Sequence, residues 1–182
     1  FAVPKVGAYF EYTDKVAGIG YLHGVYIGFT TNETLLCRAE AYILKGEFEQ
    51  GVTDINAWIG NRTRVQENFT KEDIVEFYSN IPYMPLGNIE SASQRTVKKE
   101  LNPQGFIVSD GDQENLIQCV LHLRRIETMH DGLRWSDIKR YGIEIAHNRD
   151  GQADDILSKD DPRRAIQLPQ DVINAGLAAN PR

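Results

Sequence analysis

Residues 31–60 read TNETLLCRAEAYILKGEFEQGVTDINAWIG, and this stretch decides the fold. Apolar residues recur at helical spacing in two runs that Gly46 separates, which predicts two helices joined by a short turn. Thr30 or Thr31 can cap the first of these helices. The second run continues to Gly60. The stretch therefore predicts an antiparallel helical hairpin.

The hairpin fits the tetratricopeptide pattern, in which small and large residues alternate at fixed places of two packed helices. Ala39 and Tyr42 take the small and aromatic places of the first helix, and Gly51 and Ile55 take the small and large places of the second. A second copy does not follow at the expected period. One such repeat cannot bury its apolar face alone, so we expect later helices or an upstream segment to cover it.

Further helices are predicted downstream. Thr70 and Asp73 form a capping-box variant that opens a short helix through Tyr78, which Pro82 and Pro85 end. The remaining predicted elements are a candidate helix at 91–101, the strongest helix from Asp110 or Asp112 to Gly132, a shorter helix at 133–141, a candidate strand at 143–146, and a final helix that starts at Pro169. The predicted fold class is mainly α, with long loops and a little strand.

The first thirty residues have a different texture. They alternate aromatic and small residues, contain five glycines, and show no helical period. This pattern is typical of irregular or extended chain. We expect residues 1–182 to form a single domain that continues from a body outside this sequence.

Composition excludes several classes of function. The chain has 182 residues and a net charge of −6, whereas a phosphate-backbone partner needs a concentrated basic face. Its basic pairs are scattered among acids, so we expect them to be solvated or ion-paired. Apolar runs stay well below the roughly 20 residues of a membrane span. Cys37 and Cys119 fall in apolar helical patterns, and the sequence leaves open whether they are bridged.

Three blocks carry a likeness to one family. The first is the ETLLCRAEAY run at 33–42, with Arg38 and Glu40, followed by Asp54. The second is RRIE at 124–127 leading into DGLRWSDIKRYG at 131–142, and its signature positions are Gly132, Arg134, Trp135, Asp137 and Arg140. The third runs from Ala165 through the proline–x–acid segment at 169–171 to Asn180-Pro181.

In sequence, order and interval, these blocks together resemble the carboxy-terminal part of SusD/RagB proteins, from about residue 33 to residue 181. Leu123 stands where an acid is usual, Tyr141 replaces a tryptophan, and Asp131 replaces a glutamate. The resemblance implies a helical fold with tetratricopeptide-like hairpins in an α–α superhelix.

The resemblance also implies a function. Members of that family are lipoproteins of the Bacteroidetes outer membrane that capture oligosaccharides or polysaccharides at the cell surface. They pass these to a SusC-like TonB-dependent transporter, with no catalysis, cofactor or metal. The lipid anchor would lie outside this chain. The alternative is a tetratricopeptide-type protein–protein interaction module, which needs a concave face lined by several stacked repeats.

Aromatic residues outside regular helices are the candidates for ligand contact, because they have fewer packing duties. We predict Tyr83, between two prolines, and Tyr78 just before it, and next Tyr9, Phe10 and Tyr12.

Trp135 and Trp58 lie at helical spacing and are predicted to be scaffold. Arg134, Asp137 and Glu127 are predicted to form an internal charge network.

Two enzyme classes also deserve comparison. Glu127–His130 and Glu144–His147 have the Glu-x-x-His spacing of di-iron ligands. The second copy lies in a predicted strand, where side chains three apart point to opposite faces, which argues against a metal site. A glycoside hydrolase needs two carboxylates across a cleft, and no pair among the 26 acids is singled out.

Overall fold

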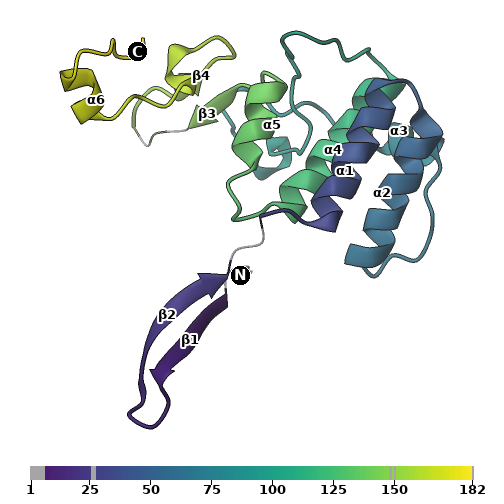
Figure 1. Cartoon of the computed structure of the whole chain (residues 1–182). Coiled ribbons are helices and arrows are strands. Elements are labelled where there is room, and N and C mark those ends of the chain that lie inside the picture. Colours follow the sequence, from purple (N-terminus) through teal and green to yellow (C-terminus); the bar gives the residue numbers. More distant parts are fainter. Residues whose placement is uncertain (1–6, 26–27, 148, 150, 182) are drawn as a thin grey trace.

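The computed structural model describes residues 7–25, 28–147, 149 and 151–181 (Figure 1). Helices dominate, and two small antiparallel sheets accompany them. The elements in chain order are β1 (Gly7–Asp14), β2 (Ile19–Val25), α1 (Thr31–Leu44), α2 (Phe48–Arg62), α3 (Lys71–Ser79), α4 (Asp112–Glu127), α5 (Arg134–Arg140), β3 (Ile145–His147), β4 (Asp155–Leu157) and α6 (Gln170–Asn174). The mainly helical prediction is thus confirmed at the level of class. Among the described helices, none has the length and apolarity that crossing a membrane requires.

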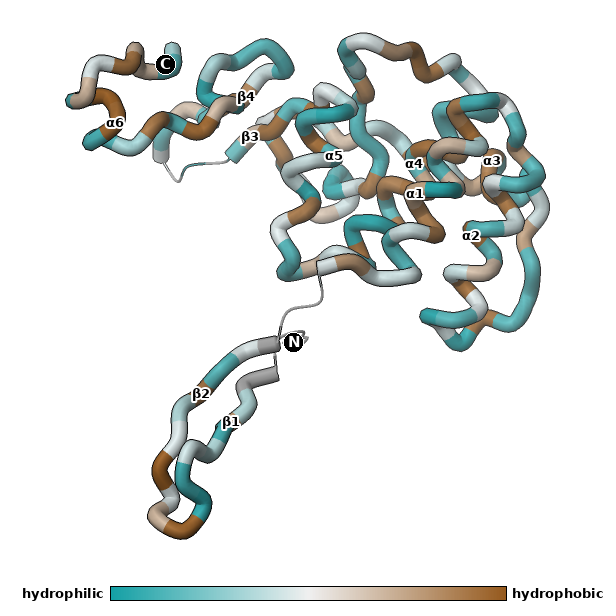
Figure 2. Tube along the Cα trace, viewed as in Figure 1, coloured by the Kyte–Doolittle hydropathy of each residue, from teal (hydrophilic) through white to brown (hydrophobic). Residues whose placement is uncertain are grey.

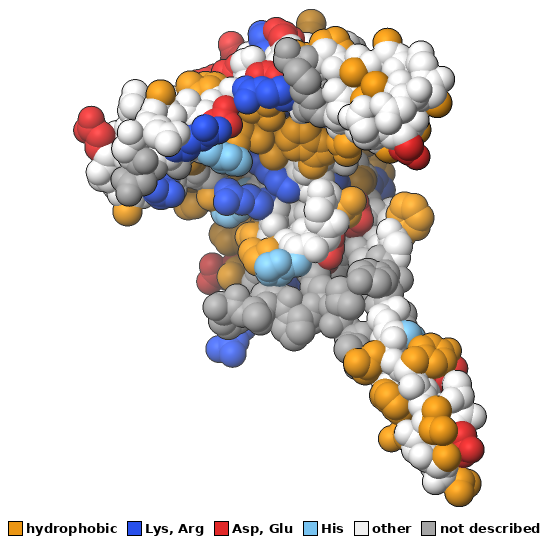
Figure 3. All heavy atoms as spheres, turned by 90° about the vertical axis from the view of Figure 1, so that its left-hand side faces the viewer, with side chains coloured by type: hydrophobic (Ala, Val, Ile, Leu, Met, Phe, Trp, Pro, Cys, Tyr) orange, Lys and Arg blue, Asp and Glu red, His pale blue; other side chains and the backbone are white. Residues whose placement is uncertain are grey.

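Strands β1 and β2 form an antiparallel hairpin that projects away from the helical body (Figure 1). Extended chain was predicted here, but the pairing of the two strands was not. Phe10 covers Gly20, where an added Cβ would lie 2.7 Å from the ring. Hydrophobic residues mark the turn of the hairpin (Figure 2) and hydrophobic side chains stand along its surface (Figure 3). Val16 is 99% exposed.

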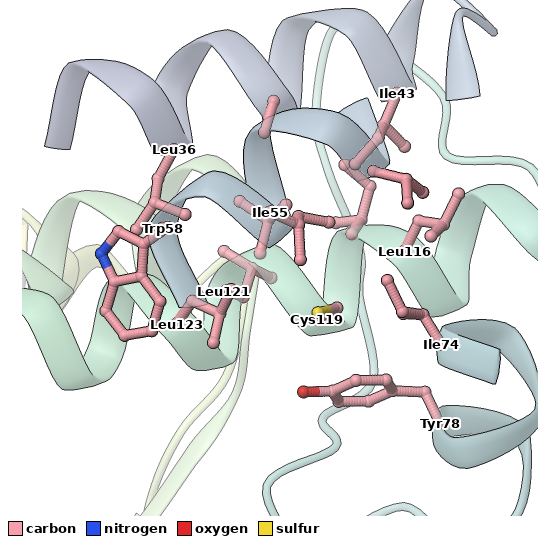
Figure 4. Close-up of a cluster of buried hydrophobic side chains, with 14 of the residues drawn as sticks. Leu36, Ile43, Ile55, Trp58, Ile74, Tyr78, Leu116, Cys119, Leu121 and Leu123 are labelled. Carbon is pink, nitrogen blue, oxygen red and sulfur yellow. The ribbon is translucent and has the colours of Figure 1, made fainter. Parts of the chain in front are cut away.

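The core forms where α1, α2, α3 and α4 meet (Figure 4). Helix α4 packs against both α1 and α3, while α2 lies antiparallel to α1. The side chains with no exposed surface are Leu36, Ala39, Ile43, Ile55, Leu116, Ile117, Val120 and Tyr141. Helix α4 therefore supplies the surface that the α1–α2 hairpin cannot provide for itself.

The predicted hairpin of residues 31–60 is confirmed. The Thr30 hydroxyl accepts a hydrogen bond from the backbone N–H of Glu33 at 3.0 Å and caps α1. Helix α1 ends at Leu44, and Gly46 turns the chain with a φ of +82°. Helix α2 runs to Arg62, two residues beyond the predicted end at Gly60.

The α3 capping box is also confirmed. The Thr70 hydroxyl accepts from the Asp73 N–H, and the Asp73 carboxylate accepts from the Thr70 N–H at 2.8 Å.

The predicted ends of α4 are wrong. Its N-cap is Gly111 with a φ of +87°, and no side chain caps the helix, so neither Asp110 nor Asp112 takes that place. The helix ends at Glu127, five residues before Gly132. Thr128 closes it by donating its hydroxyl to the Arg124 carbonyl at 2.8 Å.

The candidate helix at 91–101 is wrong except for a single 3-10 turn, Ala92–Gln94. Gln94 turns its side chain back to accept from the Glu90 N–H at 2.7 Å. After it, the Gln118 amide on α4 bonds both backbone groups of Lys99. The ammonium of Lys98, which is 5% exposed, donates to the Tyr78 carbonyl at 2.9 Å. These side-chain partners hold the segment extended against α4.

The later elements follow the prediction closely. The short helix at 133–141 and the final helix after Pro169 form as α5 and α6, and β3 begins two residues after the start of the candidate strand and extends one residue beyond it. Strand β3 pairs with β4 in an antiparallel register, Ile145 opposite Leu157.

Gly51 allows α1 and α2 to approach closely, since a Cβ there would lie 2.6 Å from Cγ1 of the buried Ile43. Gly51→Ala should lower the free energy of unfolding by about 1–3 kcal/mol through overpacking, which outweighs a helix-propensity gain of about 1 kcal/mol. Denaturant unfolding measures the change.

Gly60→Ala in the same helix is the matched control, because a Cβ there meets nothing within 4 Å. It should raise stability by roughly 0.5–1 kcal/mol. Equal effects of the two substitutions would show that Gly51 does not govern the helix contact.

Candidate functional site

One groove of about 860 Å³ lies between the extended segment after α3, the outer face of α4, helix α5 and strand β3. Its lining residues are Tyr83, Met84, Pro85, Leu86, Gly87, Ile89, Arg95, Thr96, Val97, Lys99, Glu100, His122, Arg125, Ile126, Met129, Arg134, Ile138, Ile143, Glu144, Ile145, Ala146 and His147. The volume falls within the range of small-molecule sites. Apolar and basic side chains share its walls.

Tyr83 lies on this groove, and the structure keeps it as a candidate for ligand contact. Its side chain is 36% exposed, and its hydroxyl donates to the Glu114 carboxylate. The Lys98 ammonium lies 4.7 Å from the ring centroid. Burial, followed by the Glu114 carboxylate, raises the pKa of the phenol. The ring is therefore held in place by contacts at both its edge and its face.

Tyr78 was predicted to contact ligand from the end of a short helix, and the structure instead places its side chain in the core. It belongs to α3, is 5% exposed, and packs in the core (Figure 4). Its hydroxyl lies 2.9 Å from Nδ1 of His122. Burial, then the adjacent Cys119, raises its pKa. Ile74 and Tyr78 are four residues apart, which places both on the buried face of the helix.

A second cavity of about 600 Å³ lies beside α3, with Phe77, Tyr78, Cys119 and His122 in its wall. Phe77 is 60% exposed. Burial raises the pKa of the Cys119 thiol to about 12, so the thiol stays protonated at neutral pH and is a poor nucleophile. The cavity offers an apolar surface without an activated group.

Four basic side chains line the groove near one another: Lys99 from the extended segment, His122 and Arg125 from α4, and Arg134 from α5. Burial, then Arg125 and Arg134, lowers the pKa of both Lys99 and His122. Burial also lowers the pKa of Arg134, where the opposing charge of Asp137 is partly offset by Arg125 and Arg124. Basic and histidine side chains stand beside hydrophobic ones on the face drawn in Figure 3.

A buried ion pair supports this side of the groove. Arg124 Nε donates to Asp137 Oδ1 at 2.9 Å, and the side chains are 7% and 4% exposed. Arg134 Nη1 lies 3.8 Å from the second Asp137 oxygen. Burial raises the pKa of Asp137, while the two guanidinium groups oppose that shift.

Glu40 joins α1 to the end of α5. Its Oε1 accepts from Arg140 Nε at 2.8 Å and from the Tyr141 hydroxyl at 2.7 Å. Arg38, on the same helix, makes a two-point contact with Asp54 of α2 at 2.7 and 2.8 Å. These four contacts connect residues that are up to 101 positions apart in the sequence.

The predicted network of Arg134, Asp137 and Glu127 forms only in part. Glu127 belongs to a different cluster, where its carboxylate accepts from Trp58 Nε1 at 3.0 Å and from Arg62. Trp58 is 2% exposed, so its prediction as scaffold is confirmed. Glu127 is separate from Arg134 and Asp137 because α4 ends at Glu127 and the chain turns before α5 begins at Arg134.

The remaining signature residues have local roles. Trp135 is half-buried on α5 and does not line the groove. Gly132 has a φ of +77°, a left-handed conformation that favours glycine, at the turn into α5.

The hairpin aromatics Tyr9, Phe10 and Tyr12 are 56%, 45% and 52% exposed. Phe10 and Tyr12 share one face, with ring centroids 4.8 Å apart. Tyr9 lies on the opposite face beside His23, with ring centroids 6.1 Å apart. They form an exposed surface on the hairpin and do not line the groove.

The part of the chain that the structure describes contains no disulfide bond and no cluster of metal-ligating side chains. Cys37 and Cys119 are both free, and Cys37 is exposed whereas Cys119 is buried. Within the described residues, no three His, Cys, Asp or Glu side chains gather where a metal ion would fit. Of the two Glu-x-x-His pairs, the second lies at β3, as predicted.

Sequence reasoning missed the basic wall of the groove. It treated Lys98-Lys99 and Arg124-Arg125 as solvated or ion-paired. In each pair the structure buries the first residue, which bonds to core partners, and turns the second toward the groove. Adjacent residues point in different directions, so the sequence could indicate that the two members of each basic pair have different surroundings. It could not indicate which member faces the groove, because that depends on where the neighbouring segments lie.

We compared the chain with protein-family models, with curated proteins and with solved structures, and none of the three comparisons found a match.

Asp137→Asn should lower the free energy of unfolding by about 3 kcal/mol, because it leaves the buried Arg124 without its counter-charge. Chemical denaturation followed by far-UV circular dichroism measures it. Asp155→Asn, in the exposed pair with Arg163, is the control and should change stability little. Similar losses in both variants would contradict a special role for the buried pair.

His122 should titrate below the ordinary histidine value of 6.5, because burial and the nearby guanidinium groups disfavour its charged form. A depressed folded-state pKa means that His122 contributes stability above pH 6.5, which is lost as pH falls through the folded value. NMR titration of the imidazole measures this pKa.

Arg125→Gln should raise the pKa of His122 toward its ordinary value, since it removes one repelling charge. Lys139→Gln removes an exposed charge on α5 that does not line the groove, and should leave the His122 pKa unchanged. A His122 pKa at or above 6.5 in the unsubstituted chain would contradict the electrostatic account.

Proposed function

We propose that this chain is the carboxy-terminal part of a SusD/RagB-like protein that captures oligosaccharides or polysaccharides at the surface of the outer membrane. In this proposal it holds the glycan without cleaving it and delivers it to a SusC-like TonB-dependent transporter. A lipid anchor outside this chain would attach the protein to the membrane.

The observation that carries the proposal is the set of contacts that Glu40 makes. Glu40 belongs to the first block of likeness to that family, and Arg140 and Tyr141 belong to the second. Residues of the same two blocks also pair within their own regions, Arg38 with Asp54 and Arg124 with Asp137. These signature residues hold helices together. Residues with that role are the ones we expect proteins of the same fold to share.

The third block supports the same reading. Gln167 and Asn180 stand near its two ends and exchange hydrogen bonds through backbone and side chain, at 2.9 and 3.1 Å. The Asn180 side chain also donates to the Ile166 carbonyl at 2.7 Å. The asparagine that precedes Pro181 therefore closes the segment around α6.

The finer fold assignment is part of this proposal. The α1–α2 hairpin has a glycine at the tetratricopeptide small position, where Gly51 meets Ile43 and the Ala39 carbonyl. Helix α4 covers the hairpin. We assign these elements to one turn of a tetratricopeptide-like α–α superhelix.

The groove is the proposed place for the glycan. Sugar rings present apolar C–H faces and polar hydroxyl edges, and binding sites for such ligands combine aromatic surface with a few fixed polar groups. Tyr83, Ile126 and Met129 supply partly exposed apolar surface. Thr96 and Glu100, on the extended segment after α3, supply polar groups.

The protein-interaction alternative draws on a different surface. The β1–β2 hairpin exposes apolar side chains along its length, including Ile19 at 60% and Leu22 at 71%. A two-stranded hairpin is marginally stable alone, so a protein surface that covers this one would add stability. The alternative therefore predicts protein binding that depends on the hairpin, and glycan binding that is absent.

Isothermal titration calorimetry of the chain against a panel of soluble neutral and acidic polysaccharides tests the proposal. Reducing ends are assayed in the same samples, because the groove contains two carboxylates, Glu100 and Glu144, that a hydrolase would use. We expect binding without release of reducing ends. Tyr83→Ala should weaken binding about tenfold, the equivalent of one aromatic contact.

Tyr83→Phe keeps the ring and removes only the hydroxyl that donates to Glu114, so it should bind like the unsubstituted chain. Release of reducing ends would overturn the claim that the protein does not cleave its ligand. Absence of binding to every polysaccharide would overturn glycan capture by this chain and favour a protein partner.

A further inference from the structure

We propose that Lys99, Arg125 and Arg134 form a subsite that binds an acidic sugar residue through its carboxylate or sulfate group. This inference rests on the proposed glycan-binding function and specifies the ligand class.

The groove has a positive excess within an acidic protein. The whole chain carries a net charge of −6. Four lysine or arginine side chains line the groove, together with His122 and His147, against the two carboxylates of Glu100 and Glu144. A concave wall of one sign concentrates its electric field and raises the local concentration of ligands of the opposite sign.

The charges of Lys99, His122, Arg125 and Arg134 are close enough to repel one another. Arg125 and Arg134 both contribute to lowering the pKa of Lys99 and of His122, after the larger effect of burial. Arg125 acts on Arg134 in the same direction. The cluster is therefore under electrostatic stress that a bound anion would relieve.

Carboxylates of the protein leave this cluster largely uncompensated. Across the described residues, no ion pair joins Lys99 or Arg125 to an acid, and the Lys99 ammonium lies against the sulfur of Met84. Arg134 has one ionic contact, 3.8 Å from Asp137. Asp137 accepts the 2.9 Å hydrogen bond from Arg124 through Oδ1, whereas Oδ2, the oxygen that faces Arg134, is buried and has no hydrogen bond among the described residues.

The surroundings of Arg134 Nη1 give the most specific support for the subsite. This nitrogen is buried, and among the described residues it has no hydrogen-bond partner. A buried donor without a partner is costly, so a ligand oxygen that reached it would recover that free energy. Elsewhere in the described chain, Arg38, Arg62 and Arg140 each contact a carboxylate at 2.7–3.0 Å.

The cluster is preorganised by buried neighbours. Gln118, 3% exposed, bonds the backbone N–H of Lys99 at 3.3 Å and its carbonyl at 2.5 Å. Arg125 projects from α4, next to Arg124, whose pair with Asp137 joins α4 to α5. The three cations are thus attached to elements that are fixed to one another before a ligand arrives.

The type of cation and the surroundings favour an acidic sugar. A guanidinium group matches the planar geometry of a carboxylate and makes two parallel hydrogen bonds to it. Sulfate presents similar oxygens to the same donors. The partly exposed Ile126, Met129 and Tyr83 lie in the same groove and offer apolar contact to the rest of a sugar unit.

The experiment is a calorimetric titration of the whole chain at fixed ionic strength with matched pairs of polymers. Polygalacturonate is compared with its carboxyl-reduced counterpart, and dextran sulfate with dextran, so the two pairs distinguish carboxylate from sulfate. Polyglutamate serves as an acidic polymer without sugar. We expect at least one acidic polysaccharide to bind at least tenfold more tightly than its neutral partner.

Arg125→Gln and Arg134→Gln should each weaken the binding of that acidic polysaccharide about tenfold, because each removes one charge-assisted hydrogen bond. Lys139→Gln removes the same charge from exposed α5 surface and should not change binding. Arg125 is exposed, so its variant tests the subsite even where Arg134→Gln fails to fold. The acidic ligand should also raise the pKa of His122 in the NMR titration, since it places negative charge beside the ring.

The outcomes separate this inference from the proposed function. Equal affinity for acidic and neutral polysaccharides would overturn the acidic subsite and leave glycan capture standing. Polyglutamate binding as tightly as the acidic polysaccharide would overturn the sugar-specific subsite and count against glycan capture. An effect of Lys139→Gln equal to that of Arg125→Gln would overturn the subsite, because it would show only a response to net charge.

Discussion

Arg124 and Asp137 form an ion pair inside the protein, where both side chains are nearly closed to water. The pair joins α4, the helix that covers the α1–α2 hairpin, to α5, which forms one wall of the groove. Charges are costly to bury, and only close geometry with a partner offsets that cost. This contact therefore helps to set the relative position of the core and the groove.

Other buried polar contacts extend the same constraint. Glu40 ties α1 to Arg140 and Tyr141, and Glu127 ties the end of α4 to Trp58 of α2. Each carboxylate takes hydrogen bonds from at least two different side chains, which fixes direction as well as distance. The apolar core supplies the driving force for folding, while these contacts select one arrangement of the helices.

The groove is a consequence of how this framework uses adjacent basic residues. Lys98 and Arg124 are drawn into the framework, and Lys99 and Arg125 are left on the other side of the chain. Arg140 pairs with Glu40, while its neighbour Lys139 stays exposed. The result is a cationic wall on an acidic protein, beside apolar side chains of α4.

The amino-acid sequence by itself determined the local elements: the α1–α2 hairpin, the α3 capping box, α5 and the start of α6. Their signals are periodicity and caps, which act over a few residues. Only the tertiary structure decided that 97–101 is extended on α4, that Tyr78 is core, and that Lys99, Arg125 and Arg134 share a groove. Those outcomes depend on partners tens of residues away, such as Gln118 and His122, whose positions exist only once the chain has folded.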